Sequence, residues 1–250
     1  MPAYLKDNAA YQTAALAPTH AIAAPLPGPA TLLGMLARSY NAVGGLIDVL
    51  GASLNVDPAA VLAVWHVESG NLPYIAGAPV LRFENHKFFQ NWGDDHVALF
   101  DAHFQFGGHA GIPGASYTNH KFRALATDPW APFHGTQKGE YKVFNFAQTL
   151  ANKEAACMSA SFGGTQIMGF NHNACGYATA SALFDAFGRD LRWQVLGFFD
   201  FCQSNGLFDK IRQLKWESFG ARYNGNGAVY GPKLAEAYAQ KAALLALPRT

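Results

Sequence analysis

Glu68 is the residue of this sequence best suited to donate a proton. In the segment that leads to it, Asp57 can cap the free backbone amides, Pro58 occupies the first helical position and Gly70 can end the run. This spacing predicts a largely apolar helix with Glu68 on its last turn. The negative end of the helix dipole and apolar neighbours both disfavour an ionised carboxylate there. We therefore expect a raised pKa and a general acid; the ordinary alternative is a solvated carboxylate at a helix end.

Three short motifs that lie far apart in the sequence accompany this residue. They read VESGN (67–71), SFGGTQIMG (161–169) and ARYNGNG (221–227). A Glu-Ser at a helix end, a Gly-x-x-Gln-Ile turn and a Tyr-Asn-x-Gly segment, in this order, resemble the three signatures of goose-type lysozymes and lytic transglycosylases. With LRFENH (81–86) and SFGARYNG (218–225) added, the chain is similar to the N-acetylmuramidase family of phage endolysins. The resemblance covers roughly residues 37–245.

The resemblance implies a fold, a reaction and an origin in a phage endolysin. The fold is mainly α, a lysozyme-like helical domain with a small β element beside the cleft. The reaction is cleavage of the β-1,4 bond between N-acetylmuramic acid and N-acetylglucosamine in peptidoglycan glycan strands, with Glu68 as the acid. A carboxylic acid that stays protonated near neutral pH is needed because an alkoxide is a poor leaving group.

A second carboxylate must activate water or form a covalent intermediate, and the resemblance places it at Glu84. An ion pair of Glu84 with Arg82 or Lys87 is an equally ordinary use of this side chain. Other acidic residues in the following loop are open alternatives for the same role: Asp94, Asp95 and Asp101.

Four further residues are expected to bind the substrate. Gln166 and Asn224 carry amides that suit N-acetyl groups and hydroxyls. Tyr223 combines an apolar face with a hydroxyl, although a core tyrosine would look the same. Ser69 is expected to orient Glu68 or bind substrate, and the alternative is a hydroxyl bonded to its own helical turn.

Metal and cysteine chemistry are the rival catalytic hypotheses. No HExxH or comparable ligand spacing is present, so we expect neither a metal nor an organic cofactor. The three cysteines are expected to be reduced, and their apolar settings argue against a nucleophile, with Cys175 the one in a plausible loop. Histidines are nevertheless concentrated in one stretch, at His86, His96, His103, His109, His120 and His134.

Composition narrows the function classes further. Eighteen basic and 17 acidic residues give a net charge of +1, so no basic field favours nucleic acid or an anionic membrane. Charged residues make up 14% and aromatic residues also 14% of the chain. Aromatic faces stack on sugar rings, which suits a neutral polymer, although core packing is their commoner use.

The elements that must position these residues are predicted to be mainly helices. Residues 31–55 read as two short helices joined at Gly44 and Gly45, and residues 80–92 as a strand or a short helix. The stretch that follows, to about residue 139, is rich in Gly, His and Pro and looks irregular. Further helical zones are expected at 141–160, 179–207, 210–221 and 233–246.

The domain organisation is predicted to be a flexible Ala/Pro-rich tail at residues 1–30 and a catalytic domain at residues 31–250. We expect no signal peptide, so the protein would be made in a host cytoplasm and reach the wall after release or delivery. We also expect a monomer with no membrane insertion. Two functional alternatives stay open: a lytic transglycosylase that forms 1,6-anhydro products, and a non-catalytic wall-binding component of a phage or injection particle.

Overall fold

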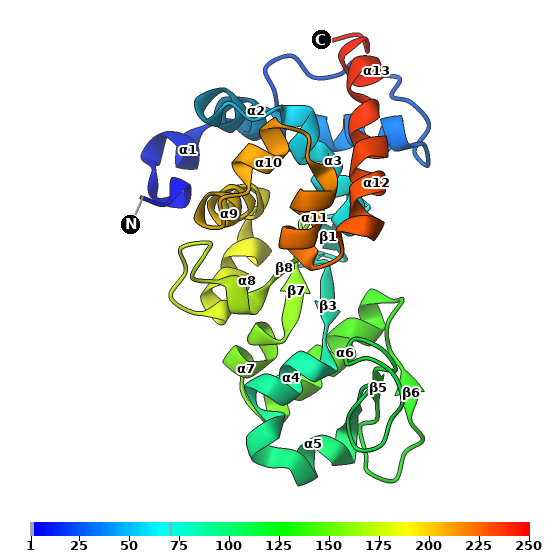
Figure 1. Cartoon of the computed structure of the whole chain (residues 1–250). Coiled ribbons are helices and arrows are strands. Elements are labelled where there is room, and N and C mark those ends of the chain that lie inside the picture. Colours follow the sequence, from blue (N-terminus) through cyan, green and yellow to red (C-terminus); the bar gives the residue numbers. More distant parts are fainter. Residues whose placement is uncertain (1–2, 71) are drawn as a thin grey trace.

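The chain forms a mainly α structure with a few small sheets, as the resemblance implied. The computed structural model describes residues 3–70 and 72–250 (Figure 1). Its helices are α1 (Ala9–Thr13), α2 (Leu32–Leu54), α3 (Pro58–Ser69), α4 (Asn85–Asn91), α5 (Val97–His103), α6 (Gln137–Leu150), α7 (Lys153–Met158), α8 (Ala180–Arg189), α9 (Leu191–Ser204), α10 (Phe208–Arg212), α11 (Trp216–Asn224), α12 (Gly227–Ala239) and α13 (Lys241–Leu245), with 3₁₀ turns η1 (Leu5–Asp7), η2 (Gly93–His96) and η3 (Gly169–Asn171).

Three small antiparallel sheets accompany the helices. The strands are β1 (Tyr74–Ile75), β2 (Ala78–Pro79), β3 (Leu81–Phe83), β4 (Phe104–Gln105), β5 (Lys121–Phe122), β6 (Ala131–Pro132), β7 (Ala160–Phe162) and β8 (Ile167–Met168). The sheet orders are β1-β2, β3-β7-β8 and β4-β5-β6. In the middle sheet, Leu81 pairs with Phe162 and Ser161 with Met168.

The molecule has two parts, which Figure 1 shows one above the other. We call the upper part, with α1–α3 and α8–α13, the helical body, and the lower part, residues 84–158 with α4–α7 and β4–β6, the lobe. Strands β3 and β7 connect the two parts. Phe88, Phe104 and Phe144 form an aromatic core in the lobe, and Phe83 of β3 packs against them. Each of the four is at most 1% exposed, so much of the aromatic content packs the interior.

Helix α3 has the boundaries that the sequence predicts. The Asp57 carboxylate accepts a hydrogen bond from the amide of Ala59, Pro58 opens the helix, and Gly70 ends it in the left-handed conformation at φ 60°. The second Asp57 oxygen accepts from the hydroxyl of Tyr238, which ties the start of α3 to α12. Because both ends of α3 are fixed, the position of Glu68 on its last turn is fixed too.

Helix α2 differs from the prediction of two short helices, because Leu32–Leu54 is one continuous helix. The glycines serve close packing and do not break the helix. A Cβ on Gly45 would lie 2.2 Å from the carbonyl oxygen of Ala17, and the amide of Gly45 donates to the carbonyl of Leu16 at 2.9 Å. The N-terminal segment thus lies directly on α2.

The described part of the predicted tail, residues 3–30, contacts the helical body. The amides of Leu5 and Lys6 donate to the carboxylate of Asp200, and Arg192 donates to two carbonyls near α1. Ile22 is 3% exposed. Periodicity does not reveal such a segment, because its few apolar residues are spaced irregularly among Ala and Pro. Its flexibility, and the domain boundary at residue 30, stay predictions.

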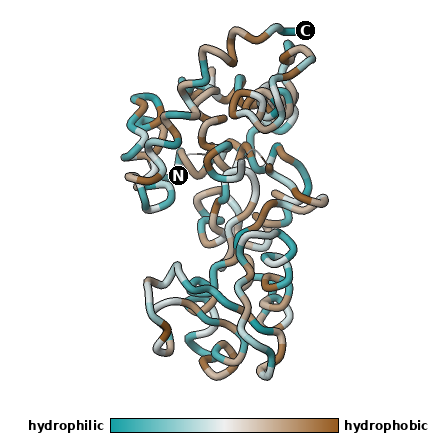
Figure 2. The backbone as a smooth tube through the Cα atoms, turned by 90° about the vertical axis from the view of Figure 1, so that its right-hand side faces the viewer, coloured by the Kyte–Doolittle hydropathy of each residue, from teal (hydrophilic) through white to brown (hydrophobic). Residues whose placement is uncertain are grey.

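Within the described residues, no helix combines the length and the apolar character that crossing a membrane requires. Figure 2 shows hydrophobic and hydrophilic residues interleaved along the helices of both parts.

Candidate active site

A cleft of about 570 Å³ lies beside the β3-β7-β8 sheet, where the lobe meets the helical body. A neighbouring hollow of about 320 Å³ shares Glu68, Arg82 and Gln166 with it, so open space continues on two sides of Glu68. Both parts of the molecule contribute walls. The cleft is lined by Glu68, Arg82, Glu84, Ser161, Gln166, Ile167, Met168, Asn171, Phe201, Tyr223, Asn224 and Tyr230.

Glu68 is the acid of this cleft. Burial raises the pKa of its carboxyl from 4.5 to about 8, against smaller lowering effects from the Asn224 amide and the charge of Lys233. The Asn224 Nδ2 atom lies 3.5 Å from Glu68 Oε1, at the limit of a hydrogen bond. At neutral pH the carboxyl therefore carries its proton while it still faces the cleft.

Glu84 lines the same cleft from the junction of β3 and α4. Its Oε1 accepts from Arg82 Nε at 2.7 Å, so the ion pair considered from the sequence is present alongside the cleft position. Lys87 instead donates to Gln90. Among the described residues that line the cleft, Glu68 and Glu84 are the two carboxylates. The alternatives Asp94, Asp95 and Asp101 lie outside this lining, and Asp101 bonds His109.

Gln166 reaches the cleft wall, but its amide is already used by the protein. Its Nε2 donates to the carbonyls of Val80 and Gly163, and its Oε1 accepts from the hydroxyl of Ser161. Its backbone has φ 48°, a conformation that few side chains adopt. Gln166 therefore holds the β7–β8 turn against Val80, which lies between β2 and β3. The structure favours a positioning role over the direct amide contact expected from the sequence.

Tyr223 and Asn224 reach the cleft from the end of α11. The Tyr223 hydroxyl donates to the carbonyl of Thr165 at 2.7 Å, and its ring stacks on Phe219. Burial raises the pKa of this phenol well above its ordinary value, and the charge of Glu68 acts in the same direction. Tyr223 thus ties α11 to the β7–β8 turn. Asn224 is exposed, and its Oδ1 accepts from the amide of Asn226 at 3.3 Å.

Ser69 does not line the cleft. Its hydroxyl donates to the carbonyl of Trp65 at 3.1 Å, which is the helical-turn alternative stated for it above. Asn71, the last residue of the VESGN motif, lies outside the described residues.

Several cleft residues are absent from the sequence-based set, Tyr230 and Arg82 above all. Burial and the nearby Glu68 raise the pKa of Tyr230, which approaches from α12. Arg82 points into the cleft from β3, as alternation in a strand allows, yet no spacing in the sequence marks either residue. The other residues missed are Ser161, Ile167, Met168, Asn171 and Phe201.

The cysteines do not form a nucleophilic site. Cys157, Cys175 and Cys202 are free and buried. The sequence indicated apolar settings for Cys157 and Cys202, whereas it placed Cys175 in a loop. Burial raises the pKa of Cys157 to about 12 and shifts the other two thiols upward as well. None of them lines the cleft.

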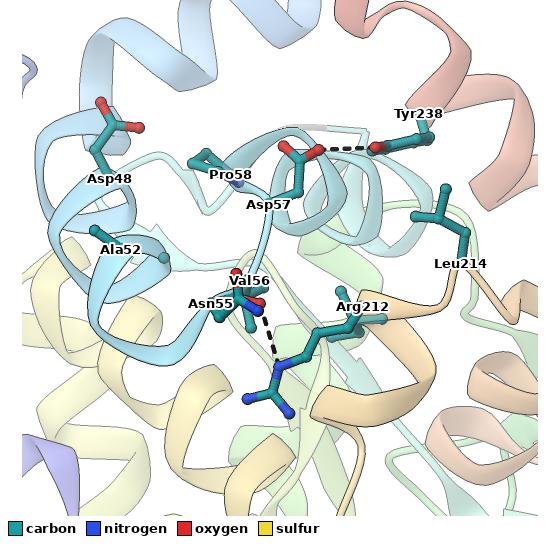
Figure 3. Close-up of a pocket in the computed structure, with 11 residues that line it drawn as sticks. Asp48, Ala52, Asn55, Val56, Asp57, Pro58, Arg212, Leu214 and Tyr238 are labelled. Atoms are coloured by element: carbon teal, nitrogen blue, oxygen red, sulfur yellow. Dashed lines mark hydrogen bonds between the residues drawn. The ribbon is translucent and has the colours of Figure 1, made fainter.

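A separate hollow of about 480 Å³ lies at the opposite end of α3 (Figure 3). Asp57 there is bonded to Tyr238 and Lys241, and Arg212 donates to the carbonyl of Leu54. Glu68 lies eleven positions after Asp57 along the helix, a distance of about 16 Å at 1.5 Å per residue. Its charged groups are already paired within the protein, so this hollow is not part of the acid's site.

The fold and the cleft define a class: a mainly α, lysozyme-like protein with a protonated carboxyl in a cleft beside a small sheet. The family model for N-acetylmuramidase matches residues 57–242. The chain belongs to the N-acetylmuramidase family, and the polymer on which it acts is peptidoglycan.

A solved structure supports the fold. The crystal structure of the Burkholderia AP3 phage endolysin is similar to this chain, with a TM-score of 0.58 and 24% sequence identity over 80% of this chain and 70% of that one. No curated protein matches the sequence significantly.

Proposed function

We propose that this chain is an endolysin-type N-acetylmuramidase, a glycoside hydrolase that cleaves the β-1,4 bond between N-acetylmuramic acid and N-acetylglucosamine. The observation that carries the proposal is the carboxyl of Glu68, whose pKa of about 8 keeps it protonated in a cleft that also contains Glu84. Hollow space on both sides of Glu68 suits an extended glycan strand that is cut within its length.

The proposed reaction needs both carboxyl groups. Glu68 donates its proton to the glycosidic oxygen as the bond from that oxygen to the anomeric carbon breaks. Glu84 either takes a proton from an attacking water or bonds the anomeric carbon first, and then water completes the hydrolysis. The hydroxyl of the water ends on the anomeric carbon of N-acetylmuramic acid. In the covalent route the bond from Glu84 to that carbon breaks and the water gives its other proton to Glu68; in the direct route that proton ends on Glu84, and exchange with solvent restores the starting protonation of both carboxyl groups. Arg82 holds Glu84 Oε1 in the cleft during either route.

The experiment is a digest of purified sacculi analysed by mass spectrometry, with wild type and Glu68→Gln compared. The glutamine keeps the shape of the side chain but cannot donate the same proton, so we expect a loss of about 10²–10⁴-fold in rate. Reducing N-acetylmuramic acid ends would support the proposal. Equal digestion by the variant would remove Glu68 as the acid.

Other products of the same digest identify the competing functions. Anhydro ends would mean attack by the sugar's own 6-hydroxyl and hence a lytic transglycosylase. Free peptide ends would mean an amidase or peptidase. Undigested sacculi that retain bound protein would mean a wall-binding component without catalysis.

A further inference from the structure

The side chains of Glu84, His86 and His120 converge where the cleft meets the lobe. Glu84 and His86 come from the start of α4, and His120 comes from the loop before β5. Glu84 Oε2 lies 3.5 Å from His86 Nδ1 and 3.4 Å from His120 Nδ1, and the three atoms all lie within 4.8 Å of one another. Glu84 Oε2 and His86 Nδ1 are buried, and neither has a hydrogen-bond partner among the described residues.

Buried polar atoms without partners are costly, so such a pair needs a physical reason. The hydrogen bonds of His120 show which of its ring nitrogens carries the proton. Its Nε2 lies 2.9 Å from the carbonyl of Ser116, and because a carbonyl can only accept, Nε2 carries the proton and Nδ1 is a lone pair. Burial lowers the pKa of both rings, which favours the neutral form of each imidazole.

We propose that Glu84, His86 and His120 bind a divalent transition-metal ion, with zinc as the ion that fits this set best. Two imidazoles and one carboxylate are a known zinc ligand set that leaves a fourth position for water. Metal–ligand bonds of about 2.0–2.1 Å in tetrahedral geometry separate the ligand atoms by about 3.3–3.4 Å. The separation of 3.4 Å between Glu84 and His120 has this size, and the 3.5 Å between Glu84 and His86 is slightly longer.

The surroundings of the three residues agree with this site. A metal-bound histidine commonly donates its other N–H to a backbone carbonyl, as His120 does to Ser116. The side chain of His120 is fully buried, whereas those of Glu84 and His86 are 13% and 12% exposed, which leaves a route for the ion. A bound ion would fasten the loop before β5 to the start of α4.

One contact competes with the ion. His134 Nε2 lies 3.0 Å from His120 Nδ1, and His134 Nδ1 lies 2.8 Å from Glu140 Oε1. A metal on His120 Nδ1 must displace this hydrogen bond. Removal of His134 therefore keeps all three ligands and removes the competitor, which distinguishes a metal site from a relay of hydrogen bonds.

The inference departs from the sequence-based expectation of no metal. In the sequence, residues 86 and 120 are separated by an irregular stretch with no recognisable ligand spacing, and only the fold brings them together. The inference does not depend on the proposed catalysis, because it concerns Glu84 Oε2 whereas Arg82 binds Oε1. Its readout is binding, so the failure of one proposal leaves the other intact.

The test is a titration of the untagged full chain, stripped with a chelator, with ZnCl₂ by calorimetry and with Co²⁺ by visible absorption. We expect one equivalent to bind. His86→Ala and His120→Asn should each weaken binding at least 100-fold, Glu84→Gln should also weaken it, and His134→Ala should bind as tightly as wild type or more tightly. His109→Ala is the matched control, because His109 lies in the same lobe but bonds Asp101.

The outcomes decide the proposal. Circular dichroism of each variant without metal separates loss of a ligand from loss of the fold, and His86→Ala, which removes the ligand with the more exposed ring, serves if His120→Asn does not fold. The proposal is overturned if wild type binds no stoichiometric ion, if folded His86→Ala binds like wild type, or if His109→Ala loses binding equally.

Discussion

Glu68 is protonated because of where the chain places it, at the end of an apolar helix and against the aromatic wall of a cleft. Of the residues identified here, it is the one whose chemistry depends most directly on burial. Its pKa of about 8 has a consequence for activity and a separate one for stability.

The consequence for activity is a descending limb in the pH profile. A general acid works only in its protonated form, so kcat/KM should fall as pH rises through about 8. The measurement is the initial rate on a soluble glycan fragment from pH 5 to 10, since a soluble substrate avoids pH effects on the wall itself. A descending limb near pH 4.5, the ordinary range of a glutamate, would contradict the role of Glu68.

The consequence for stability is that the raised pKa of Glu68 makes the folded wild type less stable as pH rises. Folded protein holds the Glu68 proton up to about pH 8, whereas the unfolded chain releases it near 4.5, so the wild type loses stability as pH rises across this window. Glu68→Gln cannot ionise and escapes this loss. We expect the variant to gain over wild type between pH 4.5 and 8, by about 3 kcal/mol at most at pH 7. Contact with solvent reduces this figure.

Thermal unfolding at pH 4 and pH 7 measures the effect. The variant and wild type should differ more at pH 7 than at pH 4. Ser218→Ala, which changes an exposed side chain of α11 that does not ionise, is the control and should show no such pH-dependent gap. A gap of the same size at both pH values would show that the glutamine acts through packing and not through the proton.

At the scale of elements, the sequence predicts those features that residues close together in the chain determine, such as the boundaries of a helix. Helix α3 was predictable because a capping aspartate, an N-terminal proline and a terminal glycine act within a few residues. The bonds of Gln166 to Val80 and Ser161, and the approach of Tyr230 to Glu68, were not, because each joins elements that are distant in sequence. Motif resemblance found Gln166 without revealing that its amide is used internally.

The glycines of α2 show how one signal can have two meanings. A glycine pair inside a helical pattern indicates a break when nothing contacts it, and a close approach when another segment does. The predicted break at Gly44 and Gly45 was wrong because the segment before residue 18 packs there. This contact also gives a test of the predicted flexible tail.

Gly45→Ala and Gly188→Ala form a matched pair for that test. A methyl group at position 45 would collide with the carbonyl of Ala17 and disturb the hydrogen bond to Leu16, so we expect a loss of about 1–3 kcal/mol in the free energy of unfolding. At position 188, in α8, the nearest atom would be 3.9 Å away, and alanine should stabilise by about 0.5–1 kcal/mol. Urea unfolding measures both.

The comparison tests whether residues 3–30 are docked in solution. If the segment were a free tail, Gly45 would be an ordinary helical glycine, and alanine there would stabilise the protein as it does at position 188. A stabilised Gly45→Ala variant would therefore restore the tail prediction.

At the scale of the whole molecule, the cleft depends on both parts at once. Glu68 and Tyr223 belong to the helical body, Glu84 begins the lobe, and the β3-β7-β8 sheet joins them. The chain has 18 basic and 17 acidic residues, so no strong overall field draws it to the wall. Shape and hydrogen bonding in the cleft must supply most of the affinity for substrate.

Hydrogen exchange on a bound complex can show whether a glycan engages all of these walls. In Glu68→Gln, which should bind a soluble peptidoglycan fragment without cutting it, we expect slower amide exchange in three separate segments: 81–84, 160–168 and 223–230. They should respond together, because a glycan strand that lies beside Glu68 contacts the sheet, the lobe and the α11–α12 junction.

The hollow of Figure 3 provides the internal control, since it is similar in volume but lies at the far end of α3. Exchange at 51–58 and 211–214 should not change. Protection confined to those segments would place the substrate in the wrong hollow, and protection of 223–230 alone would mean that the lobe and its Glu84 take no part in binding.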